Sequence, residues 1–141
     1  MMNTFEKHSL TLPNDVKAIP QLASFVEEVA ERYGADLSVT MSLNLALEEA
    51  VVNVMNYAYP QDTFGEINIT ASFSDNTLIF TISDAGTPFD PTKVSDPDTS
   101  LSATDRPIGG LGIHLVRQIM DEVSYTYENN HNILTIKKKI Q

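Results

Sequence analysis

The chain has 141 residues, 42% hydrophobic and 20% charged, which is enough for one globular domain with a core and too few for two. Its 9 basic and 19 acidic residues give a net charge of −10, which argues against direct binding of nucleic acid or of an anionic membrane. The lack of cysteine excludes disulfides, Cys-ligated zinc and a thiol nucleophile. We find no signal peptide and no run of about 18 apolar residues, so we expect a single cytoplasmic domain over residues 1–141.

The first half of the chain predicts one strand followed by two helices. Residues 5–12 have the character of a strand. A helix is expected from Pro20, where the missing N–H would have no helical partner, to a stop at Gly34. A second helix is expected from Ser38, as its N-cap, to Tyr59, because a proline follows.

The second half predicts two hairpins separated by a loop and a helix. Apolar residues alternate with polar ones over 66–83, which is typical of a hairpin with one buried face. Residues 87–108 are polar and have no apolar period, and so long a stretch inside a domain is often a functional lid. A helix follows at 109–123 and a second hairpin at 123–140. This order predicts an α/β (α+β) sandwich, with one sheet and helices packed on one face.

The second predicted helix carries a polar pair beside its apolar stripe. On a helical wheel at about 100° per residue, Glu49 and Asn53 fall together on one flank, whereas Glu48 falls on the far side, toward solvent. Oxygen ligands at such an edge suit Mg²⁺, and a carboxylate there can accept a proton from an attacking hydroxyl or water. The alternative is a solvated flank without a chemical role. The stripe itself comprises Leu43, Leu47, Ala50, Val54 and Tyr57.

The sequence "DAGTPFDP" at 84–91 directly follows a predicted strand. A ligand interpretation makes Asp84 the acceptor for a donor such as an adenine amino group, and Gly86 the place where the backbone closely approaches the ligand. The alternative is a strand exit in which these are ordinary turn residues.

The sequence "GGLGIHLV" at 109–116 opens the third predicted helix. Backbone N–H groups around Gly110 and Gly112, together with the helix dipole, favour a phosphate. The alternative is a flexible loop that enters a helix. The motif is neither a Walker motif nor a Rossmann fingerprint, because it lacks the Gly-Lys-Ser/Thr sequence and no strand precedes it.

Taken in order, these motifs resemble the ATP-binding domain shared by gyrase, heat-shock chaperone ATPases, histidine kinases and mismatch-repair ATPases. The sequences "EAVVN", "DAGTPFDP" and "GGLGIHLVRQIMDEVSY" are most similar to those of the small bacterial anti-sigma factor serine kinases, and the resemblance spans nearly the whole chain. It implies a two-layer sandwich in which three helices cover one face of a mixed, largely antiparallel sheet. It also implies ATP and Mg²⁺ as ligands.

The resemblance gives individual roles to the predicted site residues. It makes Glu49 the general base and Asn53 a ligand of Mg²⁺ at the bound ATP. The remaining positions would contact ATP: Asp84 and Gly86 the adenine, Gly110 and Gly112 the triphosphate, Arg106 the terminal phosphate, and Thr135 the neighbourhood of the base.

The implied function is an ATP-dependent protein serine/threonine kinase of the anti-sigma factor type. Such a protein phosphorylates a small anti-anti-sigma (STAS-domain) partner and sequesters a sigma factor, and homodimers are common in the family. The alternative is a non-catalytic module that senses ATP and switches partners. A third alternative is a simple ATPase that acts through lid closure, although the chain lacks the transducer domain of the gyrase-like machines.

Overall fold

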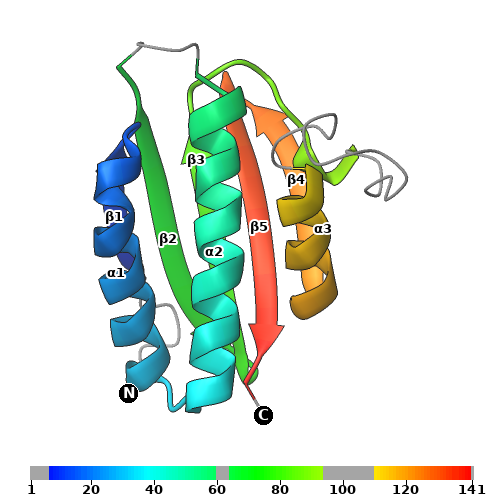
Figure 1. The fold of residues 1–141 in the computed structure, drawn as a ribbon. Coiled ribbons are helices and arrows are strands. Elements are labelled where there is room, and N and C mark those ends of the chain that lie inside the picture. The colour runs from blue at the N-terminus through cyan, green and yellow to red at the C-terminus, as the bar shows by residue number, and fades with distance from the viewer. Residues whose placement is uncertain (1–6, 60–63, 94–109, 141) are drawn as a thin grey trace.

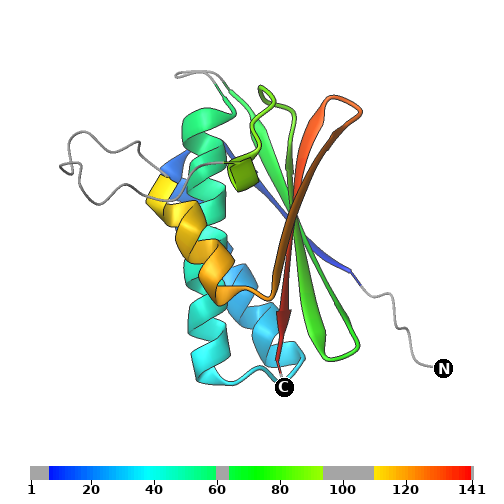
Figure 2. The same ribbon diagram turned by 90° about the vertical axis from the view of Figure 1, so that its right-hand side faces the viewer.

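The computed structural model describes residues 7–59, 64–93 and 110–140 and has two layers, a five-stranded sheet and three helices on one of its faces (Figures 1 and 2). The predicted α/β sandwich is therefore confirmed. The strands are β1 (His8–Pro13), β2 (Glu66–Ser74), β3 (Thr77–Asp84), β4 (Glu122–Glu128) and β5 (His131–Lys139). The helices are α1 (Ile19–Arg32), α2 (Leu37–Tyr57) and α3 (Gly110–Ile119), with 3₁₀ turns η1 (Val16–Ala18) and η2 (Pro91–Lys93).

The strands lie in the order β1-β2-β3-β5-β4, and each neighbouring pair is antiparallel. The parallel component of the expected mixed sheet is thus missing from the described strands. Both hairpins close through two-residue turns with positive φ, at Asp75-Asn76 (52° and 59°) and Asn129-Asn130 (53° and 64°). Asn and Asp tolerate this conformation, and its twist matches that of the strands.

The helix boundaries differ slightly from the prediction. The N-cap of α2 is Asp36 rather than Ser38, because the Asp36 carboxylate accepts a hydrogen bond of 2.8 Å from the N–H of Val39. This helix ends at Tyr57 instead of Tyr59. In the described part of the chain, no helix is both long and apolar enough to cross a membrane.

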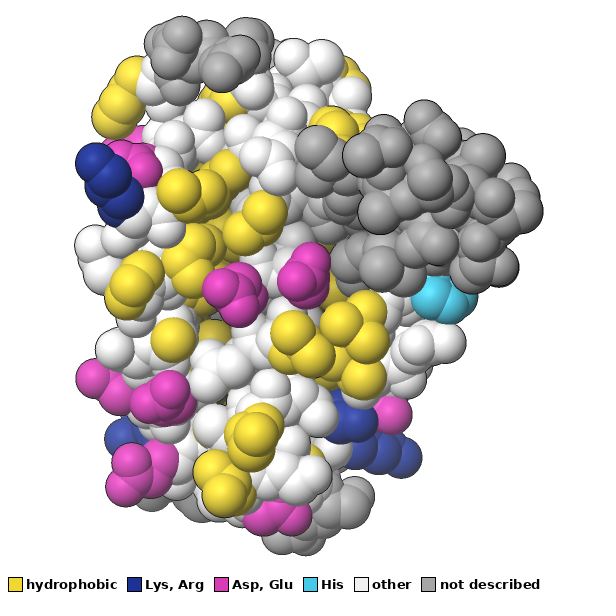
Figure 3. Space-filling model, in the orientation of Figure 1, with side chains coloured by type: hydrophobic (Ala, Val, Ile, Leu, Met, Phe, Trp, Pro, Cys, Tyr) yellow, Lys and Arg dark blue, Asp and Glu magenta, His cyan; other side chains and the backbone are white. Residues whose placement is uncertain are grey.

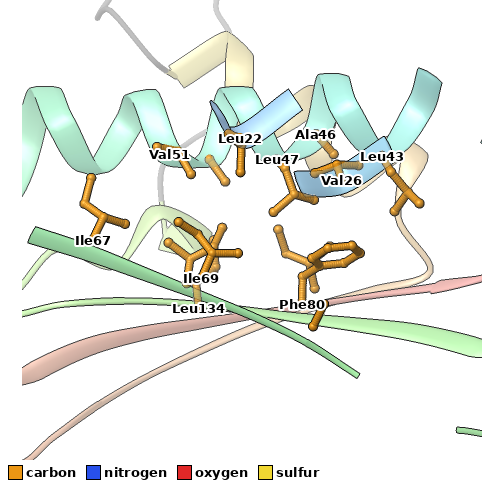
Figure 4. Packing of buried hydrophobic residues seen from close by; sticks show 14 of the residues in the cluster. Leu22, Val26, Leu43, Ala46, Leu47, Val51, Ile67, Ile69, Phe80 and Leu134 are labelled. Atoms are coloured by element: carbon orange, nitrogen blue, oxygen red, sulfur yellow. The ribbon is translucent and has the colours of Figure 1, made fainter. Parts of the chain in front are cut away.

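The core lies between the helix layer and the sheet, and α2 runs through the middle of the helix layer with α1 and α3 on either side (Figure 1). Side chains of α1 and α2 point onto strand residues in the close view of Figure 4. Because α2 is buried along most of its length, its flanks have fixed positions relative to the sheet. The labelled contacts involve Leu22, Val26, Leu43, Ala46, Leu47 and Val51 from the helices, and Ile67, Ile69, Phe80 and Leu134 from the strands.

Candidate functional site

A pocket lies between the C-terminal half of α2 and the end of the sheet that contains the last residue of β3 and the first residues of β5. Its walls are mostly apolar with a few polar groups, as is usual for small-molecule sites. Its polar lining residues are Asn53, Asp84, Tyr125 and Asn132. The apolar ones are Ala50, Val54, Ala58, Ile82, Phe89, Pro91 and Leu134.

Asp84 is the last residue of β3 and only 1% exposed. Its Oδ1 accepts hydrogen bonds from the N–H of Gly86 at 2.8 Å and from Nδ2 of Asn132 at 2.9 Å. Both of these hydrogen bonds end on Oδ1, and Oδ2 has no hydrogen bond with any residue that the structure describes. Burial raises the pKa of Asp84, while the two hydrogen bonds and the charge of His131 act in the opposite direction.

Asn132 is a site residue that the sequence analysis missed. Its Nδ2 donates to Asp84 Oδ1 and to the carbonyl of Thr87, each at 2.9 Å. Its Oδ1 accepts from the N–H of Phe89 at 2.9 Å and from the hydroxyl of Tyr125. The signal was present in β5, because counting back by twos from buried Ile136 reaches Asn132 and marks a polar residue at a core position.

The same alternation corrects the expectation for Thr135. Its neighbours Leu134 and Ile136 are both buried toward the helices, so Thr135 lies on the opposite face of the sheet. It pairs there with Thr81 and Ser124 and is not among the residues that line the pocket. Thr135 thus lies away from this pocket, and Asn132 is the polar β5 residue that lines it.

Asn53 is 4% exposed, and the nitrogen of its side-chain amide is buried without a hydrogen bond to any described residue. A buried amide without a partner loses its hydration and gains nothing in return, at a cost of about 1–3 kcal/mol. Because no described residue accepts from the amide nitrogen, the amide can also turn so that its oxygen faces the pocket. This orphaned group is suited to a ligand that supplies a donor, an acceptor or a hard cation.

Glu49 lies one helical turn before Asn53 and is half-buried, without a hydrogen bond to the described residues. It is not among the residues that line the pocket, and lies on the helix flank beside it. Glu48 is exposed and lines a groove between α1 and α2 instead. The two adjacent carboxylates therefore have different surroundings, as the helical wheel predicts. Acidic side chains lie near the middle of this helix face, between hydrophobic patches (Figure 3).

Gly86 makes a close backbone approach, but to the chain itself. A Cβ at this position would lie 2.3 Å from the carbonyl oxygen of Ala58, just after α2. The next residue, Thr87, donates its N–H to the same oxygen at 2.6 Å. The loop after β3 is thus packed onto the end of α2, and only glycine fits there.

The remaining predicted residues lie around α3. Gly110 and Gly112 belong to the first turn of α3, in agreement with a glycine-rich helix start, and α3 lies beside α2 (Figure 1). Arg106 and residues 94–108 of the predicted lid lie outside the described residues.

Comparison with known proteins agrees with this geometry. The sequence model of the histidine kinase-like ATPase domain matches residues 12–138, so the chain belongs to this family of ATP-binding domains. It is 28% identical to the serine-protein kinase RsbW of Bacillus cereus (strain AH820), over 97% of this chain and 88% of that protein. The RsbW of Bacillus anthracis (strain CDC 684 / NRRL 3495) matches equally well.

Two solved structures share the fold. The first, from Mycobacterium tuberculosis, contains the RsbU and RsbW domains of Rv1364c; it is similar with a TM-score of 0.69 and 17% identity over 96% of this chain and 32% of that longer chain. The second is the histidine kinase domain of the blue-light-activated EL346 kinase of Erythrobacter litoralis, with a TM-score of 0.55 and 16% identity over 99% of this chain and 65% of that one.

Proposed function

We propose that this chain is an ATP-dependent protein serine/threonine kinase of the anti-sigma factor type. It would phosphorylate a small anti-anti-sigma (STAS-domain) protein and, in its other state, sequester a sigma factor in the bacterial cytoplasm. The observation that carries the proposal is the orphaned Asn53 amide in the pocket of Asp84, one turn from Glu49, in a chain similar over 97% of its length to serine-protein kinases. A homodimer is part of the same proposal.

In this proposal each described polar group has one task. Asp84 Oδ2 accepts a hydrogen bond from the adenine amino group, and the apolar walls exclude water from the ring. Glu49 takes the proton of the acceptor hydroxyl, whose oxygen forms a bond to the γ-phosphorus while the bond to the ADP oxygen breaks. The N–H groups at Gly110 and Gly112, together with Arg106, would contact the phosphates.

Asn53 fits Mg²⁺, because its buried amide nitrogen has no described partner, its amide oxygen is a hard ligand, and Mg²⁺ takes few such ligands from protein. Bound at the phosphates, the ion would neutralise charge during transfer. Asn53 is thus the residue of this chain that would hold it.

The test is transfer of label from [γ-³²P]ATP to a purified STAS-domain protein, with and without Mg²⁺. We expect label on a single serine or threonine of the partner, and none on a partner in which that residue is replaced by alanine. If the protein bound ATP but transferred no phosphate to any STAS-domain protein, the result would favour the alternative, a non-catalytic module that senses ATP and switches partners.

A further inference from the structure

Asn132 is only 5% exposed and uses its whole hydrogen-bonding capacity inside the protein. Its Nδ2 has two hydrogen atoms and both have acceptors, while its Oδ1 has two donors. The orientation of the amide is fixed by this arrangement, because a flip would place acceptor against acceptor. Asn132 therefore has nothing left to offer a ligand directly.

Its four partners come from three separate parts of the fold. Asp84 ends β3, Thr87 and Phe89 belong to the loop that follows, and Tyr125 comes from β4. Phe89 also stacks on Tyr57 of α2, with ring centroids 5.2 Å apart and planes at 22°. Asn132 thus connects the buried carboxylate to the aromatic wall of the same pocket.

We propose that Asn132, supported by Tyr125, is the positioning residue that makes this pocket selective for a base bearing an exocyclic amino group. By donating to Oδ1 of Asp84, it holds the carboxylate so that Oδ2 remains as an acceptor toward the pocket. A base with a carbonyl at that edge would bring two acceptors together. The inference rests on the proposed nucleotide-binding function and assigns to Asn132 a role that acts through Asp84.

Replacing the Asn132 amide by a carboxylate tests this role, because it removes the hydrogen-bond donor to Asp84. In Asn132→Asp, one oxygen of the new side chain still accepts from Phe89 and Tyr125. The other faces two acceptors, Asp84 Oδ1 and the carbonyl of Thr87. Two carboxylates in such contact share one proton at low pH, and the shared proton restores a donor toward Asp84.

Other titratable groups act on the pair from each surrounding element. They are Tyr59 after α2, Tyr125 on β4 and His131 on β5, and Asp90 after β3 acts in turn on Tyr125. All of them are unchanged in the variant, so a new pH dependence reports the pair formed by Asp84 and the introduced carboxylate.

The experiment compares calorimetric affinities for ATP and for purine riboside triphosphate, which lacks the 6-amino group, between pH 5.5 and pH 8. The ratio of the two affinities cancels the titration of the phosphates. For the wild type we expect ATP to be favoured about 10–100-fold, as for a hydrogen bond to a charged group. For Asn132→Asp we expect a ratio near one at pH 8 that rises as the pH falls.

Two further variants complete the test. Asn130→Asp makes the same chemical change in an exposed turn two residues away and is expected to keep the wild-type ratio. Tyr125→Phe removes only a hydroxyl and is expected to lower the ratio about 3–10-fold, so it carries the test if Asn132→Asp fails to fold. A wild-type ratio at pH 8 in whichever of these two network variants folds would overturn the inference. Wild-type protein that binds no ATP would instead overturn the proposed function.

Discussion

The polar residues in and beside the pocket form two regions that are built in opposite ways. The strand end, which comprises Asp84, Asn132 and the loop 85–89, is connected by internal hydrogen bonds that leave few groups unpaired. The helix flank, which comprises Glu49 and Asn53, makes no hydrogen bond with described residues. The polar groups of the first region are thus held by internal hydrogen bonds, whereas those of the second could bind a ligand. Substitutions at the strand end should change both stability and binding, and those at the helix flank should change function alone.

The largest expected effect is at Glu49. Glu49→Gln should slow single-turnover transfer to a STAS-domain partner by about 10²–10⁴-fold, because the acceptor hydroxyl loses its general base. ATP affinity and the melting temperature should change little, since Glu49 has no internal partner among the described residues. Glu48→Gln is the matched control, because Glu48 is exposed and lines the groove between α1 and α2, away from Asn53. An inactive Glu48→Gln would show that the two glutamates have been assigned to the wrong sides of α2.

Asn53→Ala should weaken Mg²⁺-dependent ATP binding by at least about tenfold, measured by calorimetry with and without Mg²⁺. Its melting temperature should not fall, because the buried amide has no partner to lose among the described residues. Asn56→Ala, at an exposed position of the same helix, is the control. A large loss of stability in Asn53→Ala, with unchanged binding, would place Asn53 among the structural residues.

Gly86→Ala tests the strand end through its packing against α2. The new Cβ would lie 2.3 Å from the Ala58 carbonyl oxygen, so the loop must shift, and we expect a loss of about 1–3 kcal/mol in unfolding free energy together with weaker ATP binding. Gly34→Ala is a comparison without a clash, because Gly34 has a positive φ of 80° but no neighbour within 4 Å. It should cost only about 1 kcal/mol and leave binding unchanged. If urea titrations showed an equal loss of unfolding free energy in Gly86→Ala and Gly34→Ala, the packing explanation would be contradicted.

The smallest effect concerns the apo stability of Asp84→Asn. Burial raises the pKa of Asp84 above its ordinary 3.8, so the native state binds this proton more tightly than the unfolded state. The contribution of Asp84 to the unfolding free energy of the wild type therefore falls as the pH rises from about 4 through the raised pKa. The asparagine oxygen can still accept from Gly86 and Asn132, so the variant should melt about 2–6 °C higher at pH 7.5 while binding ATP more weakly. Calorimetric melting at pH 4 should show a smaller difference; a difference that grows toward low pH would contradict this sign.

Sequence reasoning succeeded where the signal is local. The alternation of apolar residues predicted the hairpins, and the helical wheel separated Glu49 from Glu48 without any knowledge of the sheet. It failed where two distant segments meet. The contact of Asp84 with Asn132 spans 48 positions and depends on the register of β3 and β5, which are not consecutive strands. The prediction for Thr135 rests on the position of its strand alone and does not distinguish the two faces of that strand.

The strand order has a consequence for how the protein is made. β5 follows every other described element of the site in the chain, yet it lies between β3 and β4 in the sheet. Until β5 has left the ribosome and paired, β4 has no neighbour in the sheet and Asp84 has no amide beside it. A growing chain therefore cannot complete the pocket before β5 pairs with β3, and the same step gives β4 its only described neighbour in the sheet.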